Sequence, residues 1–298
     1  MADILIAGCG YVGTALGILL AAEDHLVWGL RRHTEALPPS IRPLVADLTV
    51  PKTLQALPSS LDFVFYTAGA DRFDDVAYRA AYVEGLHNLL DALTGQNQQP
   101  RRILFTSSTG VYAQSSGEWV DETSPTRPSD CSGIRLLEGE RLLLGSQFPA
   151  TVLRFGGIYG PGRARLIESV REGFAVCAEG PPVYTNRIHR DDCAGALRHL
   201  MNLPQPDRLY VGVDQEPAEQ CAVLLWLATQ LGVSSPRVEP SSEPQTRRHQ
   251  SNKRCVSARL VASGYAFRYP TFREGYAALL AKEQSQASLR SAPRGRIV

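Results

Sequence analysis

The chain lacks an excess of either charge. Its 31 lysine and arginine residues are balanced by 30 aspartate and glutamate residues, which leaves a net charge of +1 at pH 7. So small a charge creates no field that would attract nucleic acid or an acidic membrane surface. The longest apolar runs, such as residues 15–22, are far too short to span a bilayer. We therefore expect neither nucleic acid nor a membrane as a partner.

Metal-binding patterns are missing as well. None of the six cysteines pairs with another at CxxC spacing, and the six histidines are dispersed without a paired cysteine or carboxylate motif. We therefore expect no metal and no thioredoxin-like site. Scattered free thiols fit a reducing cytoplasm. The N-terminal residues include an acid, Asp3, and no basic region of a signal peptide, so we expect a cytoplasmic protein.

What the chain does have is an alternation of short apolar runs with helix-like segments. Strands are expected at residues 3–7, 25–30, 44–46, 61–67, 102–106, 150–155 and 208–213, and the main helices at 11–22, 73–93, 132–145 and 191–201. Repeated strand–helix–strand units imply a parallel sheet with helices on both faces. The sequence thus predicts an α/β fold, a doubly wound Rossmann sheet with a smaller C-terminal substrate domain.

The domain boundaries follow from where this alternation weakens. We assign residues 1–155 and about 188–215 to the Rossmann domain, and residues 156–187 and 216–283 to the smaller domain that would close the substrate cleft. Residues 284–298 lack periodicity, and we expect a disordered tail there.

A glycine-rich turn, GCGYVG, follows the first strand and opens the first helix. Gly8, Gly10 and Gly13 have the GxGxxG spacing of a dinucleotide-binding turn. Gly8 would allow the tight turn, Gly10 the approach of the backbone to the pyrophosphate, and Gly13 the close packing of helix on strand. The phosphates would then meet free N–H groups at the helix start.

The end of the second strand indicates which dinucleotide is bound. NAD-binding chains carry a carboxylate there, which accepts hydrogen bonds from the ribose hydroxyls. This chain has Arg31 and Arg32 instead. Guanidinium groups suit a 2′-phosphate through charge-assisted contacts, so we predict NADP(H) in preference to NAD(H).

Further motifs extend the match along the chain. They are YTAGA (66–70), SSTGVY (107–112), LRFGGIYGPG (153–162) and NRIHRDDCA (186–194). In this order they resemble the extended short-chain dehydrogenase/reductase family, the NAD(P)-dependent group that includes sugar-nucleotide epimerases and dehydratases. The resemblance covers about residues 1–282.

The resemblance implies roles for the matched positions. The pyrophosphate would be held by the glycine turn, including Gly8, Gly10, Tyr11, Val12 and Gly13. Around the rest of the cofactor, Arg31 and Arg32 would meet the adenosine ribose, Asp47 and Leu48 would flank the adenine, and Ala68 and Gly69 would lie behind the cofactor. Ser108 matches the family's catalytic serine or threonine.

The family's catalytic YxxxK pair is not matched. SGIRLLEGE (132–140) aligns with the family's YGxSKLxxE, which puts Ser132 at the tyrosine and Leu136 at the lysine. A phenol titrates near pH 10, so at neutral pH about one in a thousand is ionised, a deficit of roughly 4 kcal/mol. Leu136 carries no charge that would lower this cost.

Three interpretations of the function remain open. In the first, which we favour, the protein is an NADP(H)-dependent oxidoreductase or epimerase with relocated acid–base groups, for which Tyr112, Tyr159 and His189 are candidates beside Ser108. In the second, it is a non-catalytic NAD(P)-binding regulator or redox sensor. In the third, the cofactor stays bound and a partner protein is the ligand.

The substrate is expected to be small or sugar-nucleotide-like and to react at a hydroxyl or carbonyl group. Four arginines would suit an anionic substrate, namely Arg154, Arg163, Arg165 and Arg187. Dimers are common in the family that the chain resembles, which allows a homodimer.

Overall fold

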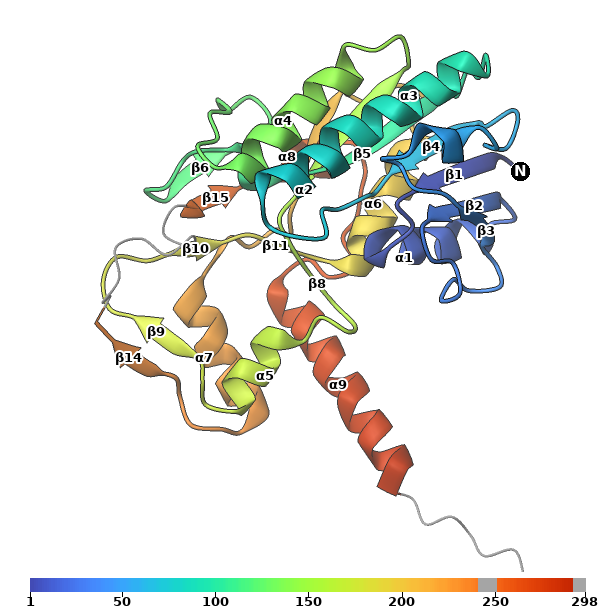
Figure 1. The fold of residues 1–298 in the computed structure, drawn as a ribbon. Coiled ribbons are helices and arrows are strands. Elements are labelled where there is room, and N and C mark those ends of the chain that lie inside the picture. The colour runs from blue at the N-terminus through green and yellow to red at the C-terminus, as the bar shows by residue number, and fades with distance from the viewer. Residues whose placement is uncertain (241–250, 292–298) are drawn as a thin grey trace, which may run out of the picture.

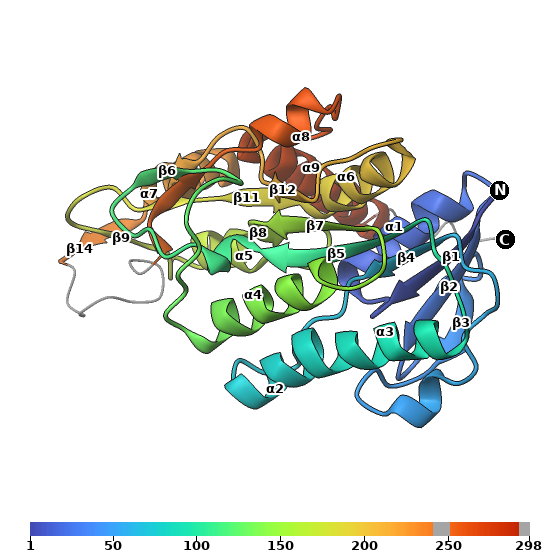
Figure 2. The ribbon, with the colours of Figure 1, turned by 90° about the horizontal axis from the view of Figure 1, so that it is seen from above.

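A large parallel sheet forms the centre of the molecule (Figures 1 and 2). The structure, a computed structural model, describes residues 1–240 and 251–291. The sheet has seven strands in the order β12-β7-β5-β4-β1-β2-β3, and every neighbouring pair is parallel. Its strands are β1 (Asp3–Ala7), β2 (Leu26–Arg31), β3 (Arg42–Val45), β4 (Phe63–Tyr66), β5 (Arg102–Ser108), β7 (Ala150–Phe155) and β12 (Leu209–Gly212). The predicted doubly wound α/β fold is confirmed.

Helices cover both faces of this sheet. They are α1 (Tyr11–Ala21), α2 (Asp75–Arg79), α3 (Gly85–Gly95), α4 (Cys131–Leu144), α6 (Arg190–Asn202) and α8 (Ala258–Ala262), with short turns η1 (Pro51–Leu54), η2 (Ala80–Glu84) and η3 (Thr109–Val111). In Figure 2, α2, α3 and α4 lie on the face opposite to α6 and α8.

The alternation of side chains along each strand explains the two layers. In β1, Ile4 and Ile6 pack into the cluster that includes Leu16 of α1 and Leu197 of α6. Leu5 points to the opposite face, into the cluster that includes α3. Successive strand residues face opposite sides, so both faces of a central strand must be apolar when helices cover both.

The order of the strands creates a ligand-binding position. The chain passes from β1 outward to β2 and β3, and then returns to place β4 on the other side of β1. The connections after β1 and β4 therefore leave in opposite directions. A crevice forms at such a switch point, outside the carboxyl ends of the strands.

A third hydrophobic cluster lies outside the sheet. Its helices are α5 (Arg165–Arg171), α7 (Gln220–Leu231) and α9 (Phe272–Ser291). Three short strand pairs accompany it, formed by β8 (Gly157–Tyr159) with β11 (Arg187–His189), β9 (Val176–Ala178) with β14 (Arg237–Glu239), and β10 (Tyr184–Thr185) with β13 (Ala218–Glu219). A fourth pair, β6 (Glu118–Val120) with β15 (Lys253–Cys255), packs in a separate cluster with α4. Between these segments of sequence, α6 and β12 return to the large sheet. The predicted domain boundaries stay a prediction.

Two expectations need correction. Cys177 and Cys221 form a disulfide between β9 and α7, so the cysteines are not all free thiols. The fold brings the two cysteines together although 44 positions separate them in the sequence, and local spacing does not reveal such a pair.

The second correction concerns the tail, because α9 continues to Ser291 where we expected disorder from residue 284. Residues 284–291 contain no glycine or proline that would interrupt the helix, and residues 292–298 lie outside the described residues.

The segment after β4 also differs from the single helix predicted over residues 73–93. It forms α2, then the π-helical turn η2, then α3. The hydroxyl of Tyr66 in β4 donates a hydrogen bond to the carbonyl oxygen of Ala81 inside η2. A side chain that competes for a helical carbonyl is a recognised cause of such an irregular turn.

Within residues 1–240 and 251–291, no helix is both long and apolar enough to cross a membrane.

Candidate functional site

The glycine turn joins β1 to α1 at the switch point of the sheet. Gly8 has a φ of +81°, and a Cβ atom there would lie 2.3 Å from the Cα of Ala68. Only glycine fits this backbone without strain. Gly13 packs against β1, where an added Cβ would lie 2.9 Å from Ile6. Gly10 faces open space, because an added Cβ would meet nothing nearer than the Gly8 oxygen at 3.8 Å.

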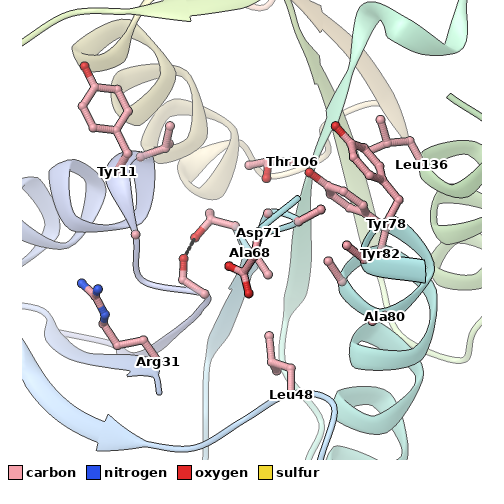
Figure 3. A pocket seen from close by; sticks show the side chains of 18 of the residues that line it. Tyr11, Arg31, Leu48, Ala68, Asp71, Tyr78, Ala80, Tyr82, Thr106 and Leu136 are labelled. Atoms are coloured by element: carbon pink, nitrogen blue, oxygen red, sulfur yellow. Dashed lines mark hydrogen bonds between the residues drawn. The ribbon is translucent and has the colours of Figure 1, made fainter. Parts of the chain in front are cut away.

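A cleft of about 1110 Å³ opens above this turn, at the carboxyl ends of the strands. Most of the predicted cofactor-binding residues line it, namely Gly8, Gly10, Tyr11, Val12, Arg31, Arg32, Asp47, Leu48, Ala68 and Gly69. Gly13 does not line the cleft, because it faces the strand. Figure 3 shows Tyr11 and Arg31 on one side of the cleft, and Tyr78, Tyr82 and Leu136 on the other.

The cleft fits an elongated dinucleotide. The first residues of α1 leave N–H groups without partners inside the helix, and no side chain caps the Gly10 end. These donors suit phosphate oxygens. The missing side chain at Gly10 leaves the space that a pyrophosphate would need. A nicotinamide dinucleotide held here would supply hydride transfer.

The two arginines at the end of β2 differ in their surroundings. Arg32 pairs with Asp71 across the cleft mouth at 2.7 Å, and both side chains are more than half exposed. Arg31 makes one long contact, from Nη1 to the carbonyl oxygen of Cys9 at 3.4 Å. In the described part of the chain, no carboxylate lies within 4.0 Å of the Arg31 guanidinium.

Asp47 and Leu48 lie beyond the end of the neighbouring strand, β3. The Asp47 carboxylate accepts hydrogen bonds from the Thr49 amide at 2.9 Å and the Thr49 hydroxyl at 2.7 Å. Burial opposes ionisation, but these hydrogen bonds and nearby Arg32 outweigh it and lower the pKa of Asp47. The carboxylate thus stays charged at the end of the cleft where Arg31 and Arg32 lie.

Ser108 also lines the cleft, from the end of β5. Its Oγ accepts a hydrogen bond from the Gly110 amide at 3.0 Å, which starts the turn η3. Ser132 and Leu136, at the expected positions of the family's catalytic pair, line the cleft from the start of α4. The Ser132 hydroxyl donates to Asp130, and Leu136 is 4% exposed among apolar neighbours.

The other three candidate acid–base residues do not line the cleft. Tyr112 is buried behind it and accepts a hydrogen bond from Arg154 at 2.9 Å. Burial raises the pKa of Tyr112 to about 12, although Arg154 opposes this. Arg154 is itself held by Glu140, at 2.6 Å, in a buried ion pair.

Tyr159 and His189 pack together between the sheet and the third cluster, with ring centroids 5.3 Å apart. Burial raises the pKa of Tyr159, whose hydroxyl has no hydrogen-bond partner among the described residues. His189 caps α6, because its Nδ1 accepts from the Asp191 amide at 3.1 Å. Burial lowers the pKa of His189 to about 4.

Of the four arginines considered for an anionic substrate, Arg163 lines the cleft. Its guanidinium lies 4.1 Å from the centre of the Tyr11 ring. Arg154 and Arg187 are buried, at 5% and 8% exposure, and Arg165 begins α5 away from the cleft. In the described residues, no group of three or more metal-ligating side chains comes together.

Two tyrosines of the cleft, Tyr78 and Tyr82, were not among the acid–base candidates that the sequence indicated. They line it from α2 and η2, and their rings lie 5.4 Å apart. Their spacing of four residues is a usable signal, since such residues share one face of a helix. The fold alone reveals that this face borders Leu136 of α4.

The sequence profile of the NAD dependent epimerase/dehydratase family matches residues 4–208. The chain belongs to this family. The match confirms the resemblance to extended short-chain dehydrogenases/reductases. The cofactor of the protein is therefore a nicotinamide dinucleotide, and its role is like that of the NAD(P)-dependent oxidoreductases and epimerases of this family.

Individual relatives agree with this assignment. A Methylobacillus flagellatus protein, described as an NAD-dependent epimerase/dehydratase, is 39% identical in sequence and has a TM-score of 0.79, over 95% of this chain and 99% of its own. The 3-diazoavenalumate denitrifying reductase of a Streptomyces species is 28% identical, over 91% of this chain and 98% of its own length. The human epimerase family protein SDR39U1, solved with NADPH, shares the fold with 22% identity and a TM-score of 0.74, over 90% of this chain and 96% of its own.

Proposed function

We propose that this member of the epimerase/dehydratase family is an NADP(H)-dependent oxidoreductase or epimerase. It acts on a hydroxyl or carbonyl group of a small or sugar-nucleotide-like substrate, with acid–base groups other than the family's YxxxK. The relative from Streptomyces, a reductase by name, favours the oxidoreductase. A cytoplasmic location and a homodimer stay predictions.

The cofactor residues are proposed as follows. Gly8, Gly10, Tyr11 and Val12 hold the pyrophosphate, and Gly13 seats the helix that presents them. Arg31 and Arg32 meet the ribose phosphate of the adenosine half, and Asp47 and Leu48 flank the adenine. Ala68 and Gly69 lie behind the cofactor. Ser108 orients the reacting oxygen of the substrate, and Arg163 is the cleft arginine for an anionic group.

The observation that carries the preference for NADP(H) is the environment of Arg31. This guanidinium lines the cleft, and none of the described residues places a carboxylate within salt-bridge distance of it. A 2′-phosphate would give it a charge-assisted partner. Arg32 is paired with Asp71, so it would have to exchange that partner for the phosphate.

Single substitutions test this preference. Arg31→Ala is expected to weaken NADPH binding by about 10–100-fold, because a hydrogen bond to a charged group contributes about 1.5–3 kcal/mol. NADH binding is expected to change much less. Titration of each purified variant with NADPH and NADH gives both dissociation constants. Arg141→Ala, on the exposed face of α4, is the matched control and should change neither.

A second variant, Asp71→Asn, removes the ion-pair partner of Arg32 but keeps the arginine itself. This variant should bind NADPH more tightly than the wild type, by about 2–5-fold, since exposed ion pairs are worth about 0.2–1 kcal/mol. An equal loss of NADPH and NADH affinity in Arg31→Ala would show that this side chain does not read the phosphate.

A non-catalytic NAD(P)-binding regulator or redox sensor is the second candidate. The observation that favours it is Leu136, an uncharged side chain at the expected lysine position of the cleft. A screen of carbonyl and hydroxyl metabolites for nicotinamide oxidation or reduction separates the two. Tight NADPH binding without hydride transfer to any compound would support the regulator.

A further inference from the structure

The hydroxyl groups of the cleft are mostly committed to the protein itself. Those of Thr49, Thr67, Thr106, Ser107, Ser132 and Tyr11 all donate hydrogen bonds to protein acceptors. For Ser108 and Tyr82, no acceptor takes the hydroxyl hydrogen in the described part of the chain. A substrate oxygen in the cleft would therefore find these two donors available.

The position of Tyr82 places this donor near the expected reaction centre. Its hydroxyl oxygen lies 3.8 Å from where a Cβ atom on Gly69 would stand, beside the wall proposed to lie behind the cofactor. Its side chain packs against the cluster that contains Leu136 and Val111. Figure 3 shows Tyr78 and Tyr82 with their hydroxyl ends turned towards the strand that carries Thr106, and Leu136 beside them.

The backbone around Tyr82 is held on two sides. The Tyr66 hydroxyl bonds the Ala81 carbonyl, and Gly85 leaves room for it, since a Cβ there would lie 2.8 Å from that hydroxyl. Gly139 of α4 lets the two helices approach, because a Cβ there would lie 2.4 Å from the carbonyl oxygen of Tyr82. The π-helical turn is thus locked, and such turns occur frequently at functional sites.

We propose that Tyr82 is the catalytic hydroxyl of this protein, in place of the family's tyrosine, and that with Ser108 it binds the carbonyl oxygen of a substrate that is reduced. The proposal rests on the proposed function and selects the reductase from it. The carbonyl carbon gains a hydride from the reduced nicotinamide, and the oxygen gains the Tyr82 proton. The C=O π bond becomes a C–H and an O–H bond, and water reprotonates the phenolate.

The surroundings of Tyr82 favour its use as a proton donor in the reduction of a carbonyl group, and not as a base in the oxidation of an alcohol. Burial, with a smaller effect of neighbouring Tyr78, raises the pKa of Tyr82 to about 12, against a small opposing effect of the Ala70 amide. At pH 7 roughly one in 10⁵ such phenols is ionised, so Tyr82 is a poor base for an alcohol. It is a competent acid towards an alkoxide, whose conjugate acid is about as weak an acid as water.

The first experiment needs no turnover. Tyrosines labelled with ¹³C at Cζ are followed by NMR over pH, and the signal that Tyr82→Phe removes is that of Tyr82. The oxidised nicotinamide carries a positive charge, and an opposite charge nearby lowers a pKa by about 1–3 units. We expect the Tyr82 phenol to titrate at least about one unit lower with NADP⁺ than with NADPH. The same pKa in both complexes would overturn the proposal.

The second experiment compares Tyr82→Phe with Tyr78→Phe, which removes the neighbouring phenol of the same cleft wall. Both variants should bind NADPH within about twofold of the wild type, so the cofactor part of the proposed function is measured separately. With 4-nitrobenzaldehyde as the probe, Tyr82→Phe should lose about 10²–10⁴-fold in kcat, the usual contribution of a general acid, with little change in KM.

Tyr78→Phe should retain most of that rate. Aldehyde reduction by Tyr82→Phe at the wild-type rate would refute the role of Tyr82, while leaving NADPH binding untouched. If the wild-type protein does not bind NADPH at all, that result would instead refute the proposed function.

Discussion

Gly8 and Gly10 are separated by a single residue, yet they lack a side chain for different reasons. At Gly8 the backbone is left-handed and the nearest atoms belong to the backbone of Ala68. At Gly10 the space beside the Cα is open to the cleft. One glycine is therefore required by the fold and the other by the ligand.

Alanine substitutions separate these two requirements. Gly8→Ala is expected to lower the free energy of unfolding by about 2 kcal/mol or more, since a strained residue costs of order 1–3 kcal/mol and the Ala68 backbone cannot move aside. Gly10→Ala should change it by no more than about 0.5 kcal/mol. Urea denaturation measures both.

NADPH titration is expected to show the opposite order of effects. Gly10→Ala should still fold but bind NADPH at least about tenfold more weakly, a change of about 1.4 kcal/mol. If it binds NADPH as the wild type does, the cofactor does not approach the backbone at this residue.

At the level of single elements, His189, a candidate catalytic residue, has a structural role as the N-terminal cap of α6. The helix begins at Arg190, directly after His189, whose imidazole caps it and is 2% exposed. Protonation of Nδ1 would remove the acceptor that the Asp191 amide needs. Burial is the main reason for the lowered pKa of His189, and Asp191 partly opposes it.

This cap makes the protein sensitive to acid. With a pKa of about 4 when folded and about 6.5 when unfolded, the native state binds fewer protons than the unfolded state between these values. The stabilisation is complete above pH 6.5 and is lost as the pH falls towards 4, by up to about 3 kcal/mol. Denaturant titrations across this range measure the loss.

His189→Asn is the matched variant, because asparagine can cap a helix but does not titrate. The difference in stability between wild type and variant should grow in favour of the variant as the pH falls from 6.5 to 4. Asp214 acts oppositely, since burial raises its pKa to about 8, and it is present in both proteins. A constant difference over this range would show that His189 does not titrate as we expect.

The segment after β4 illustrates the limit of periodicity. The sequence places Val76, Ala80, Val83 and Leu86 on one buried face of a continuous helix. In the structure Val76 is 73% exposed, and burial begins at Gly85 and Leu86. The π-helical turn shifts the register by inserting a residue, and its cause is Tyr66 in a distant strand.

For the molecule as a whole, the disulfide is expected to stabilise the third hydrophobic cluster and not the large sheet. Cys177 and Cys221 both belong to the third hydrophobic cluster, whereas the cofactor residues belong to the large sheet. The bond closes a loop across 44 positions, so it restricts the unfolded chain.

Removal of the bond should therefore destabilise the third cluster and leave the cofactor cleft intact. Cys177→Ala with Cys221→Ala is expected to lower the free energy of unfolding by about 2–4 kcal/mol. NADPH affinity should stay unchanged. Cys131→Ala is the control, since this thiol is free and partly exposed. An unchanged stability on removal of both cysteines would show that no disulfide forms in solution.

The sequence by itself determined the parts that depend on local order. Alternating apolar runs gave the doubly wound sheet, because each strand must bury both faces against helices. The glycine turn and the arginines after β2 indicated the cofactor cleft, because all strands of a parallel sheet end at one edge. Ser108 was indicated by the resemblance to the family, and it lies at the end of β5.

Only the tertiary structure decided which side chains share that cleft. Tyr112, Tyr159 and His189 lie in the sequence motifs that indicated the site. In the folded protein their side chains are buried away from the cleft, where they contact other protein groups. Tyr82 reaches the cleft because Tyr66 reshapes its helix and Gly139 admits it against α4. Cys177 meets Cys221 in the same manner. Such contacts join residues far apart in the chain, so they cannot be predicted from the spacing of residues in the sequence.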